Sequence, residues 1–233
     1  MRDGIVIPFE DQFLVITNDN SGGIGSKEQD VVQVPYDTVS YHAFRVAVME
    51  CLSLGATPIS VIVNNFCGDE EWEELVHGVE KGMLELELDL TITGSSETNI
   101  PLVQSAVGIA VLGKKRVHTS PLIEPGLRFA VIGEPLVGEE VMHHKEKVAP
   151  LPLFQWICKQ EKVVGVIPVG SKGILYELRQ LLGYDIQEDK VRVGVDMQKS
   201  AGPSTCFIVA YEESLHEVIR LKAEEHFYTI DVK

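Results

Sequence analysis

Three segments in the first half of this chain carry residue types that suit a phosphate and a divalent metal ion. They are Gly22–Lys27, Asp37–Pro58 and Gly94–Asn99. The first is rich in glycine and ends in a lysine, as Gly22-Gly23-Ile24-Gly25-Ser26-Lys27. Glycines allow backbone N–H groups to approach a phosphate closely, and the ammonium of Lys27 adds a positive charge. The segment lacks the spacing of a P-loop and that of a dinucleotide-binding turn. Taken alone, such a segment is more often a solvated hairpin loop.

Acidic residues near this turn and further along the chain are candidate metal ligands. Asp19 follows the apolar run 13–17, where an acid can reach the mouth of a sheet, although a turn is the commoner place for such a residue. Glu97 belongs to a run that also fits an ordinary polar loop, Gly94-Ser95-Ser96-Glu97-Thr98-Asn99. Carboxylates suit magnesium, which prefers oxygen ligands and bridges substrate phosphates. A nucleotide–metal site is therefore the hypothesis to test.

A third acid, Glu50, lies among apolar residues in a predicted helix. His42, Val46 and Glu50 recur at i, i+4 and i+8, so they share one ridge of that helix. Two ionisable groups on a buried ridge must pair with each other, face a cleft or hold a metal. The residues themselves leave these possibilities open.

The elements that must position these residues alternate between strands and helices. Apolar residues nearly all round predict a buried helix over Thr38–Leu54, capped by Asp37 and stopped by Gly55. A second helix opens at Asp69-Glu70-Glu71, with Glu73, Glu74, Glu80 and Lys81 facing water and an apolar stripe of Trp72, Leu75, Val76, Val79, Met83 and Leu86. Strands are predicted over Phe13–Thr17, Val31–Val34, Ile59–Asn64, Leu88–Thr93 and Val103–Leu112.

A basic run followed by two prolines predicts a domain boundary, so we expect an N-terminal domain over residues 1–116 and a C-terminal domain over 117–233.

The turn Gly170-Ser171-Lys172-Gly173 is similar to an anion-binding turn before a helix, whereas His143-His144 fits a surface helix. In the second half, strands are expected over Leu127–Ile132, Val163–Val169 and Thr205–Tyr211, and helices near Gly138–Lys147, Leu153–Gln160, Ile174–Leu182 and Glu213–Glu225.

Charge and composition limit the classes of function. The formal net charge of −15 over 233 residues argues against sequence-independent nucleic-acid binding and against docking on anionic membranes. No apolar run approaches about 20 residues and the N-terminus has no apolar signal core, so we expect a cytoplasmic protein without a membrane span. The four cysteines Cys51, Cys67, Cys158 and Cys206 are scattered along the chain and are expected to be reduced, and three of them stand in apolar runs.

In their order along the chain, three segments of the first half resemble motifs of the aminoimidazole ribonucleotide synthetase-like (PurM-like) superfamily. Gly22–Lys27 is similar to the family's turn Asp-Gly-Val-Gly-Thr-Lys. Asp37–Pro58 matches, without a gap, its Asp-Thr-Ile-Gly segment and the helix that ends before Gly-Ala-x-Pro. Ser95–Pro101 looks like its Gly-Gly-Glu-Thr-Ala-Glu-x-Pro motif. The resemblance covers about the first half of the chain, and three ordered motifs make it specific.

The resemblance implies a two-part α/β (α+β) fold, in which an N-terminal mixed sheet with flanking helices pairs across a homodimer and a smaller C-terminal α/β domain follows. It also implies ATP bound with Mg²⁺ as the cofactors. Glu50 stands for the family's helix aspartate and Glu97 for the glutamate of the third motif, while the family's turn aspartate is Gly22 here. The implied metal ligands are Asp19, Asp37, Glu50 and Glu97, and the implied phosphate-binding residues are Gly22, Gly23, Gly25, Ser26, Lys27, Gly94, Ser95, Ser96 and Lys172.

Departures from the family pattern narrow the expected reaction. His42 replaces an acid that usually helps to hold metal, and Lys172 stands where the kinase branch has an acid. These changes argue against purine ring closure and against plain thiamine-monophosphate kinase.

The branch that the chain most resembles is α-ribazole kinase, which uses ATP to phosphorylate the 5′-hydroxyl of α-ribazole in cobamide lower-ligand salvage, with Lys27 and His42 as the expected catalytic residues. The alternatives are a thiamine-monophosphate-kinase-like enzyme, a carbonyl-activating cyclase or synthetase of the same fold, and a non-catalytic nucleotide-binding module.

Overall fold

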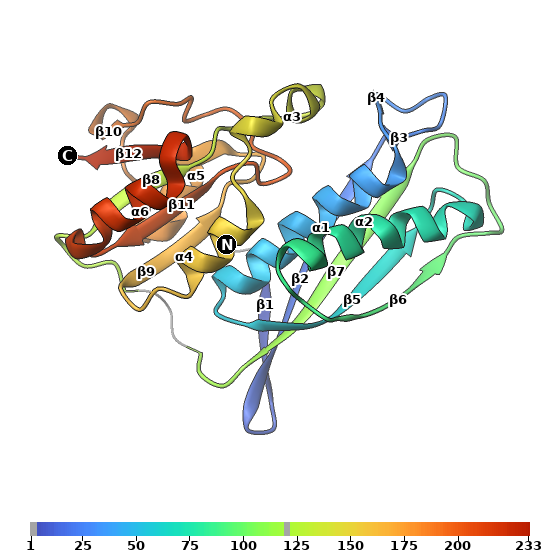
Figure 1. Cartoon of the computed structure of the whole chain (residues 1–233), viewed down its shortest axis with the longest axis horizontal. Helices are drawn as coiled ribbons and strands as arrows, with labels where there is room; N and C mark the ends of the chain where they lie inside the picture. Colours follow the sequence, from blue (N-terminus) through green and yellow to red (C-terminus); the bar gives the residue numbers. More distant parts are fainter. Residues whose placement is uncertain (1–3, 119–121) are drawn as a thin grey trace. The chain divides into compact units, whose positions relative to one another are not determined.

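The computed structural model describes residues 4–118 and 122–233, and each of these ranges forms a compact unit (Figure 1). Each unit has its own sheet, helices and apolar core. None of the helices within these two ranges is long and apolar enough to cross a membrane.

The first unit is built on a five-stranded sheet with the strand order β1-β2-β7-β5-β6. β7 is antiparallel to β2 and β5, and β5 and β6 are parallel, so β2, β5 and β6 all run in one direction. β3 and β4 form a separate parallel pair. The strands are β1 (Ile5–Phe9), β2 (Gln12–Gly22), β3 (Ile24–Gly25), β4 (Val32–Gln33), β5 (Thr57–Asn65), β6 (Thr91–Ser96) and β7 (Ala106–Lys115).

The five strands predicted for this half are confirmed, with shifted ends, whereas β1 and β3 have no counterpart among the predictions. The apolar run 13–17 is only the first part of β2, which continues to Gly22. The expectation that Asp19 follows the strand is therefore wrong. Asp19 lies inside the strand, opposite Ile109 of β7, because the antiparallel pairing continues through the polar residues without a break.

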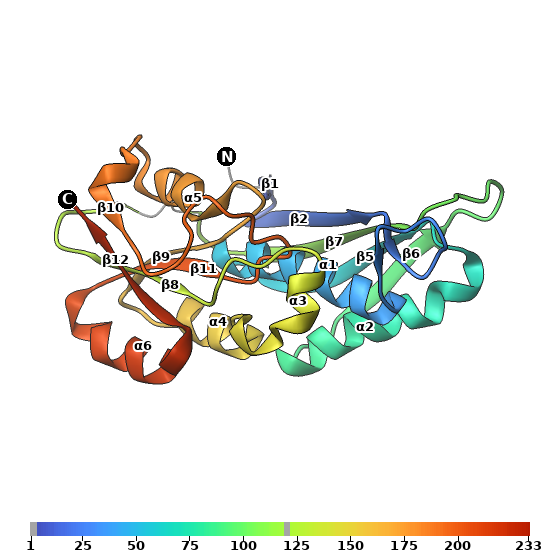
Figure 2. The ribbon, with the colours of Figure 1, turned by 90° about the horizontal axis from the view of Figure 1, so that it is seen from above.

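Helices α1 (Tyr36–Ser53) and α2 (Trp72–Glu85) cover one face of this sheet (Figure 2). α1 packs on β2 and β7, and the buried Thr17 hydroxyl donates to the Ala47 carbonyl oxygen at 2.7 Å. The helix stops as predicted, because Gly55 takes a left-handed φ of +72° that suits glycine. The hydrogen bond between Thr17 and Ala47 fixes the position of α1 along β2.

The predicted acidic start of this helix is confirmed, but Asp69–Glu71 forms a single turn of 3-10 helix. The α-helix α2 follows directly after it. α1 and α2 pack together with little space between them. A Cβ added at Gly78 would lie 2.0 Å from the Asp37 carbonyl oxygen. Glycine at this position therefore brings the start of α1 against the first turns of α2.

The opposite face of the sheet is not covered by any element that the structure describes in the same unit (Figure 2). Toward the β1–β2 turn this open face is apolar, with Ile5 and Phe9 56% and 60% exposed. Toward the ends of β2, β5 and β6 it is polar and uncharged, with exposed Asn20, Asn64 and Ser95 in one cross-strand row. One face thus carries two chemically different halves.

The second unit has a five-stranded antiparallel sheet with the order β10-β12-β8-β11-β9, and its central strand pair is wholly or largely buried. The sheet and helix α5 enclose an apolar core. The elements are β8 (Arg128–Ile132), α3 (Glu139–His143), α4 (Leu151–Cys158), β9 (Val163–Pro168), α5 (Gly173–Leu182), β10 (Val191–Arg192), β11 (Phe207–Tyr211), α6 (His216–Ala223) and β12 (Phe227–Val232).

The strands and helices predicted for this half are confirmed, although two helices are shorter than expected. The segment 138–147 divides into α3 and a 3-10 turn over Lys145–Lys147. The segment 213–225 divides into two 3-10 turns that flank α6. His143 and His144 are exposed, as predicted. β10 and β12 were not predicted: β10 is only two residues long, and the aromatic and β-branched residues of Phe227–Val232 are a strand signal that the prediction missed.

Candidate functional site

The topology gathers the polar segments at one end of the first unit's sheet. β2 ends at Gly22, β5 at Asn65 and β6 at Ser96, and these three strands run in the same direction. β7 begins at this end, since its first residue Ala106 pairs with Gly22. The glycine turn and the segment that contains Glu97 therefore leave the same edge of the sheet.

The glycine turn is a folded element and not an open hairpin loop. After Gly22 the chain enters β3, which pairs with β4. Gly25 has no room for a side chain, because a Cβ there would lie 2.5 Å from Ser105 Oγ and 2.7 Å from a ring carbon of Tyr36. The turn thus packs tightly against the residue before β7 and the first residue of α1.

Asp30 connects the turn to the rest of this end. Its side chain is 8% exposed, and its carboxylate accepts from the Ser105 N–H at 2.7 Å, the Ser105 hydroxyl at 2.6 Å and the Lys27 N–H at 2.9 Å. The Tyr36 hydroxyl lies 2.8 Å from Ser105 Oγ and completes the network. Burial acts to raise the pKa of Asp30, but the hydrogen bonds from Ser105 and Lys27 outweigh it and hold the pKa below its ordinary value.

The side chain of Lys27 joins the turn to two other loops. Its ammonium donates to the Leu102 carbonyl oxygen at 2.9 Å and to the Phe66 carbonyl oxygen at 3.4 Å. Gln104 adds a further bond from the same loop as Leu102, since its amide donates to the Gln29 carbonyl oxygen at 2.7 Å. Three loops that are distant in sequence are therefore held together at this end.

The start of α1 differs from the prediction. Pro35 occupies the position before the helix, and Asp37 lies within the first turn, where no side-chain cap forms. The Asp37 carboxylate instead accepts from the Thr38 hydroxyl at 3.2 Å. The Tyr36 N–H donates to the carboxylate of Glu74 on α2 at 3.1 Å. The prediction that Asp37 caps the helix is therefore wrong, because Glu74 of the neighbouring helix supplies the acceptor. The prediction that Glu74 only faces water is wrong for the same reason.

The loop that follows β6 is shaped by Glu97 and Asn65. One oxygen of the Glu97 carboxylate accepts from the Asn99 N–H at 2.7 Å and the Ile100 N–H at 3.1 Å. These two backbone bonds lower the pKa of Glu97. The buried Asn65 side chain donates to Ser96 Oγ at 3.0 Å, and the backbone carbonyl oxygen of Asn65 accepts from the Glu97 N–H at 2.8 Å. Glu97 is thus a fixed, ionised group.

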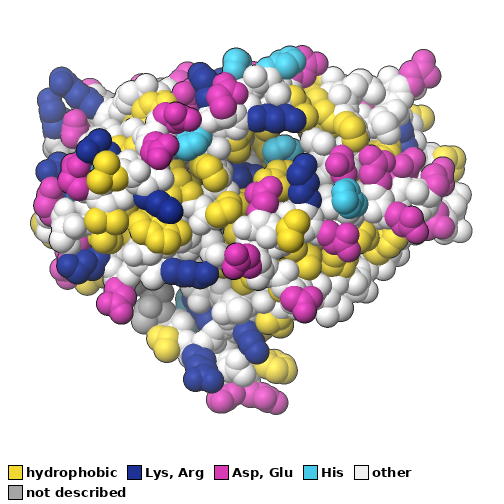
Figure 3. Space-filling model, viewed as in Figure 1, with side chains coloured by type: hydrophobic (Ala, Val, Ile, Leu, Met, Phe, Trp, Pro, Cys, Tyr) yellow, Lys and Arg dark blue, Asp and Glu magenta, His cyan; other side chains and the backbone are white. Residues whose placement is uncertain are grey.

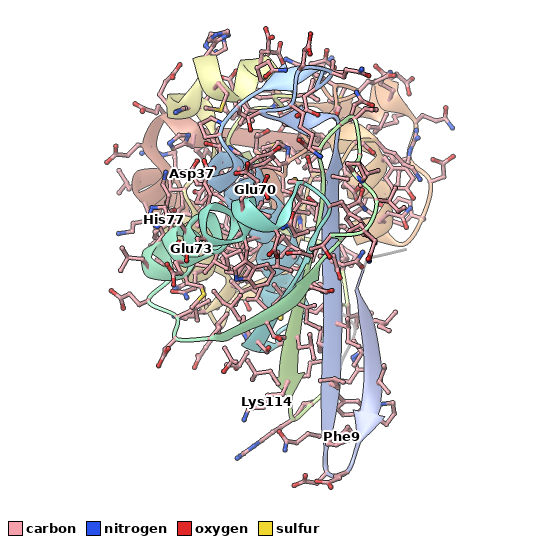
Figure 4. All side chains as sticks on the ribbon, turned by 90° about the vertical axis from the view of Figure 1, so that its right-hand side faces the viewer. Phe9, Asp37, Glu70, Glu73, His77 and Lys114 are labelled. Atoms are coloured by element: carbon pink, nitrogen blue, oxygen red, sulfur yellow. The ribbon has the colours of Figure 1, made fainter. Side chains whose placement is uncertain are left out.

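Acidic side chains gather around the starts of the two helices. Figure 4 shows Asp37 and Glu70 at this end of the unit and Phe9 and Lys114 toward the opposite end. Figure 3 shows a concentration of acidic side chains over α2. Burial, followed by the charges of Glu74 and Glu70, raises the pKa of Glu71, while Lys27 opposes the rise. An acid with a raised pKa beside a lysine is a candidate functional group.

The predicted metal ligands are not gathered into one centre by this chain. Within the two described ranges, no group of three or more His, Cys, Asp or Glu side chains is placed to hold a metal ion. Glu50 is buried and lies thirteen residues after Asp37 in α1, about 20 Å along the helix axis. One ion cannot contact both through this helix. The assignment of Asp19, Asp37, Glu50 and Glu97 to a metal stays a prediction.

The two remaining predicted residues lie elsewhere. His42 is half-buried in α1, and its ring forms a T-shaped pair with the Tyr41 ring, with 5.1 Å between centroids. Lys172 lies in the second unit, in the turn between β9 and α5, with its ammonium 4.4 Å from the centroid of the Tyr176 ring. Their proposed contacts with substrate and phosphate stay predictions.

No protein-family model and no curated protein sequence matches the chain. Solved structures with the same architecture were found. Thiamine monophosphate kinase from Aquifex aeolicus superposes with a TM-score of 0.65 over 100% of this chain and 88% of its own, at 11% identity. AaThiL complexed with AMPPCP and TMP gives 0.63 over 99% and 84%, at 11%. Hydrogenase maturation protein HypE in complex with ATP gives 0.63 over 94% and 76%, at 12%.

The chain has the fold of these proteins. The α/β fold that the sequence resemblance implied is therefore confirmed, from the first described strand to the last. Sequence identity of this order supports the fold alone, so the reaction has to be argued from the residues of the chain.

Sequence reasoning missed the groups that hold this end together: Asp30, Tyr36, Asn65, Glu74 and Ser105. Asp30 has one local signal, because an acid three residues after Lys27 can accept from that residue's N–H. The other contacts described above join residues 31 to 75 positions apart. A single sequence carries no pattern from which such distant contacts could be predicted.

The contact between Glu74 and α1 makes a testable prediction. Glu74→Ala removes the acceptor of the Tyr36 N–H and should lower the free energy of unfolding by about 1 kcal/mol, the usual cost of losing a helix cap. Glu74→Gln keeps an acceptor oxygen and should retain most of the stability. Glu73→Ala, which changes an exposed neighbour on the same helix, is the matched control. Urea denaturation measures all three, and equal stability of Glu74→Ala and Glu73→Ala would refute the capping role.

Proposed function

We propose that this chain is an ATP-dependent kinase that phosphorylates a hydroxyl group of a small nucleoside-like alcohol. The observation that carries the proposal is the meeting of the glycine turn, the start of α1 and the Glu97 loop at one end of the first sheet. Support comes from proteins of the same fold whose structures contain AMPPCP or ATP. Phosphoryl transfer depends mainly on positioning and charge neutralisation, so it requires no covalent nucleophile.

The glycine turn and the residues that end β6 would hold the phosphates through backbone N–H groups. An ammonium group has three N–H donors. Two of those on Lys27 are directed to the carbonyl oxygens of Phe66 and Leu102, so the third would reach a phosphate oxygen. Lys172 is a further candidate for a phosphate contact. The proposed phosphate-binding set is Gly22, Gly23, Gly25, Ser26, Lys27, Gly94, Ser95, Ser96 and Lys172.

Magnesium would enter with the nucleotide. Magnesium usually keeps several waters and takes one or two carboxylates together with substrate phosphates, so a complete cage of protein ligands is not required. Asp37 and Glu97 lie at the same end as the glycine turn and fit such a partial set. Asp19 is a further candidate, whereas Glu50 lies about 20 Å from Asp37 along α1 and would need a second ion. When bound, the ion would neutralise part of the phosphate charge.

The acceptor that we propose is α-ribazole, phosphorylated at its 5′-hydroxyl. The acceptor oxygen bonds to the γ-phosphorus, the bond from that phosphorus to the β–γ bridging oxygen breaks, and ADP leaves. The hydroxyl proton passes to a base, for which His42 is the candidate. The support for this acceptor is the resemblance of the chain to the α-ribazole kinase branch, including the departures at His42 and Lys172.

We further propose that the open face of the first sheet is the interface of a homodimer. Its exposed apolar residues in β1 would be covered by the same residues of a second copy. Phe9→Asp places a charge in this surface and should convert a dimer into a monomer in light scattering coupled to gel filtration. Val31→Asp, at an exposed apolar residue outside the sheet, is the control. A wild-type chain that is monomeric at tens of micromolar would refute this interface.

The kinase assay is the direct test of the function. Purified protein with ATP, Mg²⁺ and α-ribazole should form α-ribazole 5′-phosphate, and thiamine monophosphate should be a poor acceptor. Failure to phosphorylate α-ribazole would refute the proposed acceptor, and failure to bind ATP would refute the kinase. ADP and phosphate without a phosphorylated alcohol would favour a carbonyl-activating enzyme instead.

Glu97→Gln tests the role of this carboxylate within the kinase. Both of its backbone bonds go to one oxygen, so glutamine can keep them while the charge is lost. We expect the turnover rate to fall by about a hundredfold with an unchanged melting temperature. Glu73→Gln, an exposed acid on α2, should retain full activity. Full activity of Glu97→Gln would show that the charge of Glu97 is not needed.

A further inference from the structure

We infer that Asp30 is a positioning residue for the nucleotide-binding end: its carboxylate sets the conformation of the glycine turn before any ligand arrives. The inference rests on the proposed function where it concerns nucleotide affinity, and on the structure of this chain where it concerns the turn. Neither the motif resemblance nor the comparisons assign a role to this residue.

Three donors converge on this one carboxylate. The Ser105 N–H bonds to Oδ1, while the Ser105 hydroxyl and the Lys27 N–H both bond to Oδ2. Each oxygen therefore faces a donor that must remain satisfied, because the group is buried. A carboxylate meets this requirement, since it only accepts hydrogen bonds when it is ionised.

The network fixes both ends of the segment that contains the turn. Lys27 is the last residue of the glycine-rich segment, and Gly23 at its beginning donates from its N–H to the Ser105 carbonyl oxygen at 2.8 Å. Ser105 thus contacts the turn through its backbone at one end and through Asp30 at the other. Gln33 adds bonds to the carbonyl oxygens of Lys27 and Asp30, at 2.9 and 3.0 Å. The path of the backbone between Gly23 and Lys27 is consequently set by Ser105 and Asp30.

The same network reaches the helix start that the proposed site uses. The Ser105 hydroxyl donates to Asp30, so the Tyr36 hydroxyl is the donor in its contact with Ser105 Oγ. Tyr36 is the first residue of α1 and directly precedes Asp37. Asp30 therefore couples the position of the turn to that of a proposed metal ligand.

Asp30→Asn tests this role with almost no change in shape. The amide nitrogen of asparagine would face the Ser105 N–H in one orientation and the Lys27 N–H in the other, so two donors would oppose each other in either case. We expect the affinity for AMPPCP with Mg²⁺ to fall about tenfold. We also expect faster hydrogen exchange confined to residues 22–33 and 102–106. Glu28→Gln, an exposed acid in the same loop, should leave both measurements unchanged.

The measurements are calorimetric titration with AMPPCP and hydrogen exchange of the unliganded proteins, at a temperature where every variant is folded. If Asp30→Asn does not fold, Ser105→Ala removes the hydroxyl contacts with Asp30 and Tyr36, keeps the backbone bonds of Ser105, and should produce the same local effect at smaller size. Unchanged exchange in residues 22–33 would overturn the role of Asp30. Absence of AMPPCP binding by the wild-type protein would refute the proposed function instead, and the exchange comparison would still decide the role of Asp30.

Discussion

The buried Asp30 carboxylate is the interaction on which the polar end of the first unit depends. It accepts three hydrogen bonds, and two of them come from a residue 75 positions away. A buried carboxylate is costly unless its lone pairs are occupied, so the glycine turn, the residue before β7 and the start of α1 must keep their relative positions. The glycines of the turn permit this approach, since Gly25 lies where any side chain would meet Ser105. The glycines allow the close approach of the backbone, and the Asp30 carboxylate holds the turn in that position.

Sheet topology explains why the separate motifs come to one place. The three strands that end in polar residues all point to the same edge, and the antiparallel β7 begins at that edge, directly after Ser105. Lys27 then joins the loops after β5 and β6 through two carbonyl oxygens. A lysine that ties loops together and still has a third N–H suits a site in which backbone groups do most of the phosphate binding.

Local pattern predicted the parts of the fold that depend on short-range chemistry. The helix predicted over Thr38–Leu54, the apolar stripe of α2 and the main strands follow from periodicity and from glycine as a helix stop. What could not be predicted depends on partners that are distant in sequence. Pairing with β7 extends β2 through Asp19, and Glu74 replaces Asp37 as the acceptor at the start of α1. The motif resemblance identified the fold, whereas its assignment of Asp19, Asp37, Glu50 and Glu97 to a metal site stays a prediction.

A crystal structure of the protein with AMPPCP and Mg²⁺ tests the central claim most directly. The account predicts that the phosphates lie against the backbone of Gly22–Lys27, near Glu97 and Asp37, with Asp30, Ser105 and Lys27 in the same hydrogen-bonded arrangement as here. A nucleotide bound away from this end, or a glycine turn that must be rebuilt to admit the phosphates, would contradict it.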